Sequence, residues 1–138
     1  MQEFVSKSEK TTQKIGKMVA KQLKNGDIVL LYGDLGAGKT VFVKGLASRF
    51  SSANVSSPSF AILNTYKGKK QNVHHFDLYR LKSENEIYGF GGEEQLFGDG
   101  IKVVEWPVRA QLEGKERCSV QITKIDENTR RICVEWKN

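Results

Sequence analysis

One segment sets the expected fold: Gly33-Asp34-Leu35-Gly36-Ala37-Gly38-Lys39-Thr40. It matches the pattern G-x-x-x-x-G-K-[ST], in which glycines let the backbone turn tightly enough to bring several N–H groups to one phosphate. An apolar block at residues 27–32 precedes the segment, and residues 41–50 follow it with apolar side chains at helical intervals. This order of strand, glycine-rich loop and helix is the one that the motif requires. The sequence therefore predicts an α/β fold with a phosphate-binding loop between a strand and a helix.

The residue types of this loop suit the phosphates of a nucleotide. The unpaired N–H groups at the start of the following helix and the positive end of its dipole favour an anion. Lys39 supplies a mobile cation for the β- and γ-phosphates, and the Thr40 hydroxyl can bind Mg²⁺. We expect the nucleotide to contact the loop and the first helical residues, which are Gly33, Asp34, Leu35, Gly36, Ala37, Gly38, Lys39, Thr40 and Val41.

Two carboxylates are candidates for organising a metal at such a site, where an acidic residue usually ends a neighbouring strand. Asp77 follows the predicted strand 73–76, and Glu105 ends the predicted strand 101–105. Either carboxylate can hold Mg²⁺ or orient an attacking water. The adjacent His74 and His75 point to opposite faces of a strand, so we expect packing or surface roles for them rather than a two-histidine metal site.

The remaining pattern completes a mixed sheet flanked by helices. Ser6 and Glu9 have capping-box spacing ahead of an apolar helical stripe that Gly26 closes. Residues 60–66 and 73–76 predict an antiparallel hairpin, residues 85–98 at most short helical turns, and residues 119–125 and 130–136 a C-terminal β-hairpin. We expect one P-loop NTPase-like domain over residues 1–138, since no repeat or linker divides the chain.

Composition narrows the class of protein. The chain has 138 residues, 38% of them hydrophobic and only 2 prolines, which excludes a disordered or collagen-like chain. The longest apolar run, Ile28–Tyr32, is far shorter than the roughly 18 residues of a membrane span, and no leader opens the chain. Cys118 and Cys133 match no zinc pattern, so we expect reduced thiols. These features predict a soluble, cytoplasmic protein without a membrane partner.

The charge predicts attraction to anions. Lysine and arginine number 22 against 16 acidic residues, giving a net charge of +6. Nucleotide phosphates, RNA or an acidic protein face would each satisfy this excess. The basic runs at residues 7–24, 67–70 and 109–124 are dispersed along the chain, and no aromatic-basic RNA motif accompanies them. We therefore expect no specific RNA recognition by this chain alone, and no DNA partner.

Four motifs together resemble one family. GDLGAGKT at 33–40, SPSF at 57–60, HFDLYR at 75–80 and EWP at 105–107 occur in the order and at the intervals of the TsaE family. Its members are small bacterial P-loop ATPases of tRNA threonylcarbamoyladenosine biosynthesis, and the resemblance covers nearly the whole chain. It implies that ATP is the nucleotide, since no base-reading motif is identifiable from the residues themselves.

The resemblance also implies partners and a role. Family members hydrolyse ATP while docked on TsaD, which works with TsaB to transfer threonylcarbamoyl to the adenosine beside the anticodon. The ATPase is needed for repeated turnover rather than for bond formation, and tRNA is met indirectly within the complex. No arginine is placed as a finger by the motifs alone, so we expect slow, Mg²⁺-dependent intrinsic hydrolysis.

Carried over residue by residue, the resemblance gives roles to particular side chains. Lys39, Asp77 and Glu105 are the implied catalytic residues, and Thr40, Asp77 and Glu105 the implied Mg²⁺ ligands. Ser57 and Ser59 fall in a switch-like loop. The residues implied to border the nucleotide outside the phosphate loop are Thr12, Trp106 and Arg130.

Two alternatives of different classes stay open. A nucleoside or small-molecule kinase would need a second pocket and usually an arginine-bearing lid, and the arginines here are scattered. A nucleotide-gated binding module would use ATP to order the loop at residues 51–59, with hydrolysis incidental to its function.

Overall fold

The computed structural model describes residues 1–58, 62–81, 86, 92–107, 112 and 114–137 of the chain. Ser59 and the first residues of the predicted strand 60–66 lie outside these residues, as does most of the stretch 85–91. The described helices are α1 (Glu9–Ala20), α2 (Lys39–Ala47) and α4 (Glu93–Phe97). The described strands are β1 (Gln2–Ser6), β2 (Ile28–Tyr32), β3 (Leu63–Tyr66), β4 (Val73–Asp77), β5 (Ile101–Glu105), β6 (Cys118–Lys124) and β7 (Arg130–Trp136).

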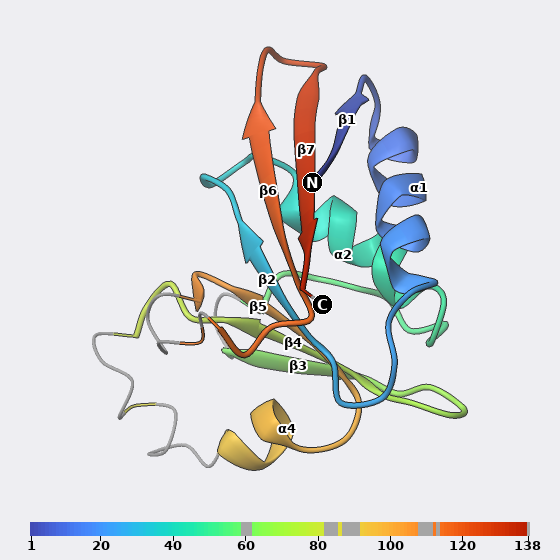
Figure 1. Cartoon of the computed structure of the whole chain (residues 1–138), viewed down its shortest axis with the longest axis vertical. Coiled ribbons are helices and arrows are strands. Elements are labelled where there is room, and N and C mark those ends of the chain that lie inside the picture. Colours follow the sequence, from blue (N-terminus) through green and yellow to red (C-terminus); the bar gives the residue numbers. More distant parts are fainter. Residues whose placement is uncertain (59–61, 82–85, 87–91, 108–111, 113, 138) are drawn as a thin grey trace.

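The strands form one mixed sheet, which confirms the predicted α/β class (Figure 1). Its order is β1-β7-β6-β2-β5-β4-β3. The four central strands β6, β2, β5 and β4 run parallel, and the hairpin strands β3 and β7 and the edge strand β1 pair antiparallel with their neighbours. Both predicted hairpins are present.

The two faces of the sheet pack against different elements. Alternate residues of the strands join α1 and α2 in the larger core, where Val29, Val103 and Phe42 are fully buried. The opposite residues form a smaller core with α4, and Leu30 and Phe76 lie there. β2 contributes to both cores because helices cover both faces of a central parallel strand, which is why its sequence reads as a continuous apolar run.

Two glycines allow α1 and α2 to approach closely. A Cβ added at Gly16 would lie 2.9 Å from the backbone N of Leu46. One added at Gly45 would lie 2.6 Å from Cα of Gln13. Since real Cβ atoms do not approach that closely, either substitution would require the helices to move apart. The glycines thus seat α1 directly on α2, the helix that follows the phosphate loop.

Three local predictions are corrected by the structure. Ser6 belongs to the edge strand β1, which the sequence did not reveal, and Ser8 caps α1 by accepting from the Thr11 N–H. Gly26 lies beyond α1, which ends at Ala20, so it does not close that helix. β3 begins only at Leu63, because Ile62 has a φ of 66° that interrupts the extended backbone.

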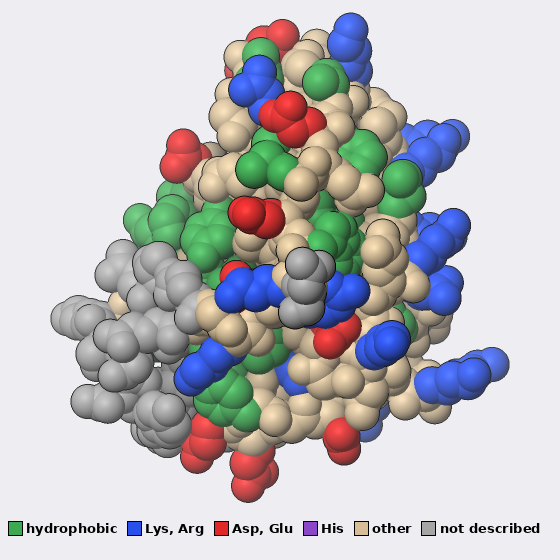
Figure 2. Space-filling model, viewed as in Figure 1, with side chains coloured by type: hydrophobic (Ala, Val, Ile, Leu, Met, Phe, Trp, Pro, Cys, Tyr) green, Lys and Arg blue, Asp and Glu red, His purple; other side chains and the backbone are tan. Residues whose placement is uncertain are grey.

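The direction of the parallel strands separates two ends of the molecule. The phosphate loop follows the carboxyl end of β2, and Asp77 and Glu105 occupy the carboxyl ends of β4 and β5. The turn between β3 and β4 precedes β4 and so lies at the other end of these strands. Lys and Arg side chains gather along the edge of the molecule formed by α1 and this turn (Figure 2).

None of the helices in the described parts of the chain has the length and apolar character of a membrane span. Cys118 is buried and Cys133 half-buried, and both are free thiols, as the sequence predicted.

Candidate functional site

The phosphate loop connects β2 to α2 through three glycines with positive φ. Gly36 has φ 79° and Gly38 has φ 105°, conformations in which a residue with a Cβ is strained. Gly38 also occupies the N-cap position of α2, and no side chain caps the helix there. The first N–H groups of α2 are therefore not used by a capping side chain, as expected where a helix start receives an anion.

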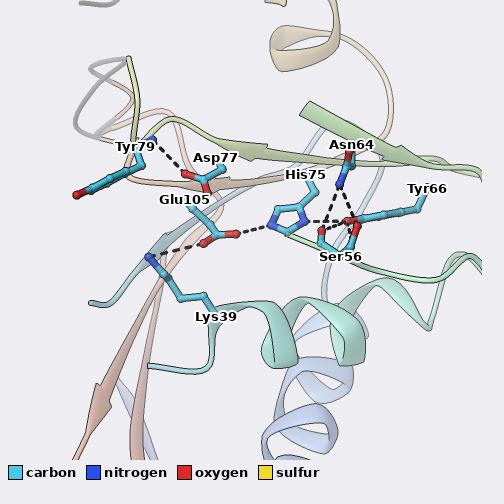
Figure 3. Close-up of polar contacts among 8 residues, drawn as sticks. All are labelled: Lys39, Ser56, Asn64, Tyr66, His75, Asp77, Tyr79 and Glu105. Carbon is cyan, nitrogen blue, oxygen red and sulfur yellow. Dashed lines mark hydrogen bonds and ion pairs between the residues drawn. The ribbon is translucent and has the colours of Figure 1, made fainter. Parts of the chain in front are cut away.

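Lys39 is held between a carboxylate and an aromatic ring. Its Nζ lies 3.6 Å from Oε1 of Glu105 (Figure 3). The same Nζ lies 4.3 Å from the centroid of the Trp106 ring. Lys39 and Glu105 are only 6% and 4% exposed. Each charge is thus compensated by the other in a site that excludes most water, where an unpaired charge would be costly. Thr40 follows Lys39 in the first turn of α2 and is half-buried.

Glu105 is bound on its other side by His75, a residue that sequence reasoning did not assign to the site. The His75 Nε2 lies 2.5 Å from Glu105 Oε2, and its Nδ1 lies 2.9 Å from the hydroxyl of Tyr66. That hydroxyl donates to the carbonyl oxygen of Ser56 at 2.8 Å, and Asn64 donates to the same oxygen at 3.2 Å (Figure 3). A chain of contacts therefore joins Glu105 to the loop after α2.

Alternation along β4 explains this arrangement. His75 and Asp77 point to the face of the sheet that α2 covers, while His74 points to the opposite face and contacts the Thr65 hydroxyl at 2.9 Å. His75 is fully buried, but a packing role alone does not describe it, because its ring also contacts Glu105. The signal for its contact with Glu105 was its position two residues before Asp77 on the same strand face.

Asp77 lies directly beside Glu105 in the register between β4 and β5. Its Oδ1 accepts a hydrogen bond from the Tyr79 N–H at 3.0 Å. Burial raises the pKa of the Asp77 carboxyl above its ordinary value, and the nearby Glu105 charge acts in the same direction. A carboxyl group whose pKa is raised by burial and by a neighbouring carboxylate is typical of a site where a cation is bound.

The donor set suits Mg²⁺. The Asp77 and Glu105 carboxylates and the Thr40 hydroxyl supply oxygen atoms, which are the ligands that Mg²⁺ prefers, and a site of one or two carboxylates completed by phosphates and water is usual for this ion. No group of three or more His, Cys, Asp or Glu side chains able to hold a metal occurs among the described residues.

A small pocket of about 200 Å³ opens beside the phosphate loop. Thr12 of α1, Val41 of α2 and Arg130 of β7 line it together with Gly38. The Arg130 Nε donates to the carbonyl oxygen of Ala37 at 2.8 Å, so β7 is tied to the loop. Arg131 is exposed, and this distinguishes the two neighbouring arginines.

Trp106 covers the site from the end of β5. Its backbone has φ 57°, a left-handed conformation that is rare for a large side chain, and its ring lies 4.9 Å from the ring of Tyr79. Backbone strain of this kind costs of order 1–3 kcal/mol and often marks a functional position. Leu35 at the tip of the phosphate loop is 71% exposed.

The sequence-predicted residues thus converge in one region. Lys39, Thr40, Asp77, Glu105 and Trp106 surround the start of α2, and Thr12, Val41 and Arg130 line the adjacent pocket. Ser57 is exposed on the loop after α2, and Ser59 lies outside the described residues.

Comparison with known proteins places the chain in a family. The family model described as "Threonylcarbamoyl adenosine biosynthesis protein TsaE" matches residues 6–132. The chain is 42% identical to a curated TsaE protein of Rickettsia felis over 94% of this chain and 77% of that protein. It is 36% identical to the TsaE protein of Treponema pallidum over 94% and 97% of the two chains.

A solved structure has the same fold. The crystal structure of Bacillus subtilis YdiB matches with a TM-score of 0.74 and 30% sequence identity, covering 95% of this chain and 82% of that one.

Proposed function

The chain belongs to the TsaE family, and from that premise we propose that it is a slow, Mg²⁺-dependent ATPase that supports tRNA threonylcarbamoyladenosine biosynthesis. Its proposed direct partner is a TsaD homologue that works with a TsaB homologue. ATP hydrolysis would reset this complex between rounds of tRNA modification. The convergence of Lys39, Asp77 and Glu105 at the glycine-rich start of α2 is the observation that carries the proposal.

Binding of the triphosphate would exchange the charge partners in the site. The N–H groups of residues 33–41 would receive the phosphate oxygens, and Lys39 would turn from Glu105 toward the β- and γ-phosphates. Glu105 is then free to face a cation. Because the Lys39–Glu105 pair is buried, it keeps both charges compensated until the ligand supplies new partners.

Thr40, Asp77 and Glu105 would hold the metal, with phosphate oxygens and water completing its coordination. Mg²⁺ bound there neutralises charge on the β- and γ-phosphates. Asp77 would also orient the attacking water from the end of β4. Phosphoryl transfer needs mainly placement and charge compensation from the protein, and these residues provide both.

The nucleoside would occupy the pocket beside the loop. Thr12, Val41 and Arg130 line it within reach of the first residues of α2. Arg130 holds the loop through Ala37 and presents its guanidinium at the pocket wall, while Trp106 bounds the phosphate side next to Lys39.

Calorimetric titration with a nonhydrolysable ATP analogue and Mg²⁺ tests the proposal directly. Lys39→Ala should abolish detectable binding and hydrolysis while leaving the fold intact, because the lysine is replaced but the loop is not. Lys44→Ala is the matched control, since Lys44 lies exposed in the last turn of the same helix. Unchanged binding by Lys39→Ala would contradict the proposed site.

Reconstitution tests the role. With TsaD and TsaB homologues and unmodified tRNA, modification beyond one round should depend on this chain and on Lys39. If modification continues beyond the first round without this chain, the proposed role in turnover is contradicted.

A nucleotide-gated binding module is the second candidate, and the contacts of Tyr66 favour it. A series of hydrogen-bond contacts runs from Glu105 through His75 and Tyr66 to Ser56. It links the proposed nucleotide site to the loop at residues 51–58. An Asp77→Asn protein that binds ATP without hydrolysing it decides between the two. Full multiple-turnover modification by this variant would favour the module, and its failure would favour the ATPase.

A further inference from the structure

A basic groove lies at the end of the molecule opposite the phosphate loop. It has a volume of about 1250 Å³ and runs between the segment after α2 and the turn that joins β3 to β4. Its charged lining residues are Lys44, Arg49, Lys67, Lys69 and Lys70, all exposed. Among the described residues that line the groove there is no Asp or Glu. Its electrostatic field therefore favours an anion with several charges.

The two walls of the groove are tied together by the backbone. Ser51 forms an isolated β-bridge with Gly68, and its hydroxyl donates to the carbonyl oxygen of Lys67 at 2.6 Å. A Cβ at Gly68 would collide with the carbonyl oxygens of Phe50 and Gln71. Because these contacts hold the walls in place, the cations of the turn are presented from an ordered backbone.

A stripe of lysines on α1 continues this basic surface. Lys10, Lys14 and Lys17 lie along one face of α1, Lys21 is its C-cap and Lys24 follows in the next segment, and all five are exposed. The stripe runs into the groove, because Leu23, between its last two lysines, belongs to the groove lining. Figure 2 shows Lys and Arg side chains along this edge, over α1 and the β3–β4 turn.

The charges of this surface are not compensated within the described part of the chain. Among the described residues, the lysines that form ion pairs are Lys39, Lys124 and Lys137, and none of them belongs to the stripe or the groove. Glu9 is the single acidic residue of α1. Like charges spaced four residues apart destabilise a helix, so this arrangement costs stability that an anionic partner would restore.

We propose that the stripe and the groove together form a basic belt that binds the phosphodiester backbone of a structured RNA. The belt consists of Lys10, Lys14, Lys17, Lys21, Lys24, Lys44, Arg49, Lys67, Lys69 and Lys70. Lysine dominates it, and lysine is a common phosphate contact but is depleted at protein–protein interfaces. The choice of RNA over an acidic protein rests on the proposed function, since the substrate of that pathway is a tRNA.

The belt reads charge and shape rather than sequence. The groove lining also contains serine, asparagine and glutamine. Among its described residues the single aromatic one is Phe50, which is half-buried. A platform of stacked bases needs exposed aromatic rings, so the contacts expected here go to phosphates and sugars. Such contacts position a protein on RNA without selecting bases.

Fluorescence anisotropy with a labelled, unmodified tRNA transcript tests the proposal on the full chain without nucleotide or partner. The belt variant carries Lys67→Gln, Lys69→Gln and Lys70→Gln. The matched control carries Lys115→Gln, Arg131→Gln and Lys137→Gln, which remove an equal number of positive charges outside the belt. The belt variant should bind at least about tenfold more weakly at ~100 mM KCl and show a salt dependence shallower by about 2 in log–log slope. The control should change affinity less than about threefold.

A second belt variant guards against local unfolding of the turn. Lys10→Gln, Lys14→Gln and Lys17→Gln change only α1 and should weaken RNA binding as the first variant does, with unchanged thermal unfolding. Intrinsic ATP hydrolysis should be the same in all variants. If the natural chain binds RNA but hydrolyses no ATP, the proposed ATPase function is contradicted while the proposed RNA-binding belt is supported.

Three results would overturn the proposal. The first is an equal loss of affinity in the belt and control variants. The second is displacement of the RNA by polyglutamate at equal charge concentration, which would indicate an acidic protein partner. The third is binding of phosphatidylglycerol vesicles that depends on the belt more strongly than RNA binding does.

Discussion

His75 Nε2 lies 2.5 Å from Oε2 of Glu105, and both side chains are buried between the sheet and α2. The contact joins two adjacent parallel strands at the edge where the nucleotide is proposed to bind. Because Glu105 also faces Lys39, the orientation of its carboxylate is set from two sides. His75 is therefore a positioning residue for Glu105.

The first prediction concerns this contact. His75→Ala should lower both thermal stability and ATP hydrolysis, because it removes the partner of Glu105 Oε2 and one of the two partners of the Tyr66 hydroxyl. His75→Gln, whose amide can reach Glu105, should recover part of the hydrolysis. Tyr66→Phe removes the hydroxyl that links His75 to Ser56 but keeps the contact between His75 and Glu105, and it should cost roughly 1 kcal/mol of stability. Thermal unfolding and steady-state ATPase rates check these effects, and equal hydrolysis by the alanine and glutamine variants would argue against positioning.

The second prediction concerns the burial of Asp77. Because the pKa of Asp77 is raised in the folded state, the contribution of this group favours folding at low pH and is lost as pH rises through the folded pKa. At neutral pH the ionised carboxylate therefore costs stability. Asp77→Asn keeps the acceptor for the Tyr79 N–H and should be more stable than the natural chain at pH 7 while losing hydrolysis.

Urea unfolding at pH 7 and near pH 4 checks this sign. The advantage of the asparagine variant should shrink toward the acidic side. A variant that is less stable at pH 7, or an advantage that grows in acid, would contradict the assigned direction.

The third prediction uses the two neighbouring arginines of β7. Arg130→Ala should weaken nucleotide binding, because it removes the bond to Ala37 and one wall of the small pocket. Arg131→Ala changes the same charge on an exposed side chain and should leave binding within about twofold, since distant surface charges are screened. Titration of both variants with a fluorescent ATP analogue makes the comparison, and equal affinities would remove Arg130 from the site.

The fourth prediction concerns the Cys118 thiol. Burial raises its pKa to about 12, so the folded chain keeps a proton that the unfolded chain loses above the ordinary value of 9.0. The stabilising contribution is complete below pH 9 and decreases by about 1.4 kcal/mol per pH unit as pH rises from there toward 12.

Denaturant unfolding of the natural chain and of Cys118→Ala between pH 8 and pH 10.5 isolates the contribution of the Cys118 thiol to the free energy of unfolding. The alanine variant should lose less stability as pH rises, whatever its stability at neutral pH. Cys133→Ala is the control that keeps Cys118 in place. Parallel curves for the natural chain and Cys118→Ala would contradict the prediction.

The fifth prediction reverses a usual sign. Alanine in place of a helical glycine normally stabilises by about 0.5–1 kcal/mol, but at Gly45 the added Cβ would meet the backbone of Gln13. Gly45→Ala should instead destabilise by roughly 1–3 kcal/mol, the cost of overpacking. Lys14→Ala on the exposed face of α1 is the control and should change stability little. Stabilisation by Gly45→Ala would show that the helices separate freely.

The sequence was most informative where a short segment determines its own structure. The loop from Gly33 to Thr40 implied both the strand before it and the helix after it, and the alternation of the last two strands predicted their hairpin. β1 was not predicted, because Gln2–Ser6 carries mostly exposed residues and its partner β7 lies at the other end of the chain.

The site was predicted only where residues carry a local motif. Lys39, Asp77 and Glu105 follow strands or a glycine loop, and the structure brings them together. The contact of His75 with Glu105 depends on the register between β4 and β5, which are far apart in the chain. The basic belt was read as dispersed charge for the same reason, since its lysines come from segments that meet only after folding.

Strand polarity has a consequence for how the proposed ligands share the molecule. Asp77 ends β4 at one pole, and the turn that carries Lys67, Lys69 and Lys70 enters β4 at the other. A nucleic acid held in the groove and a nucleotide at the phosphate loop would therefore contact different ends of the molecule. A chain bound to RNA through the lysines of this turn would still have the end with the phosphate loop exposed to a protein partner.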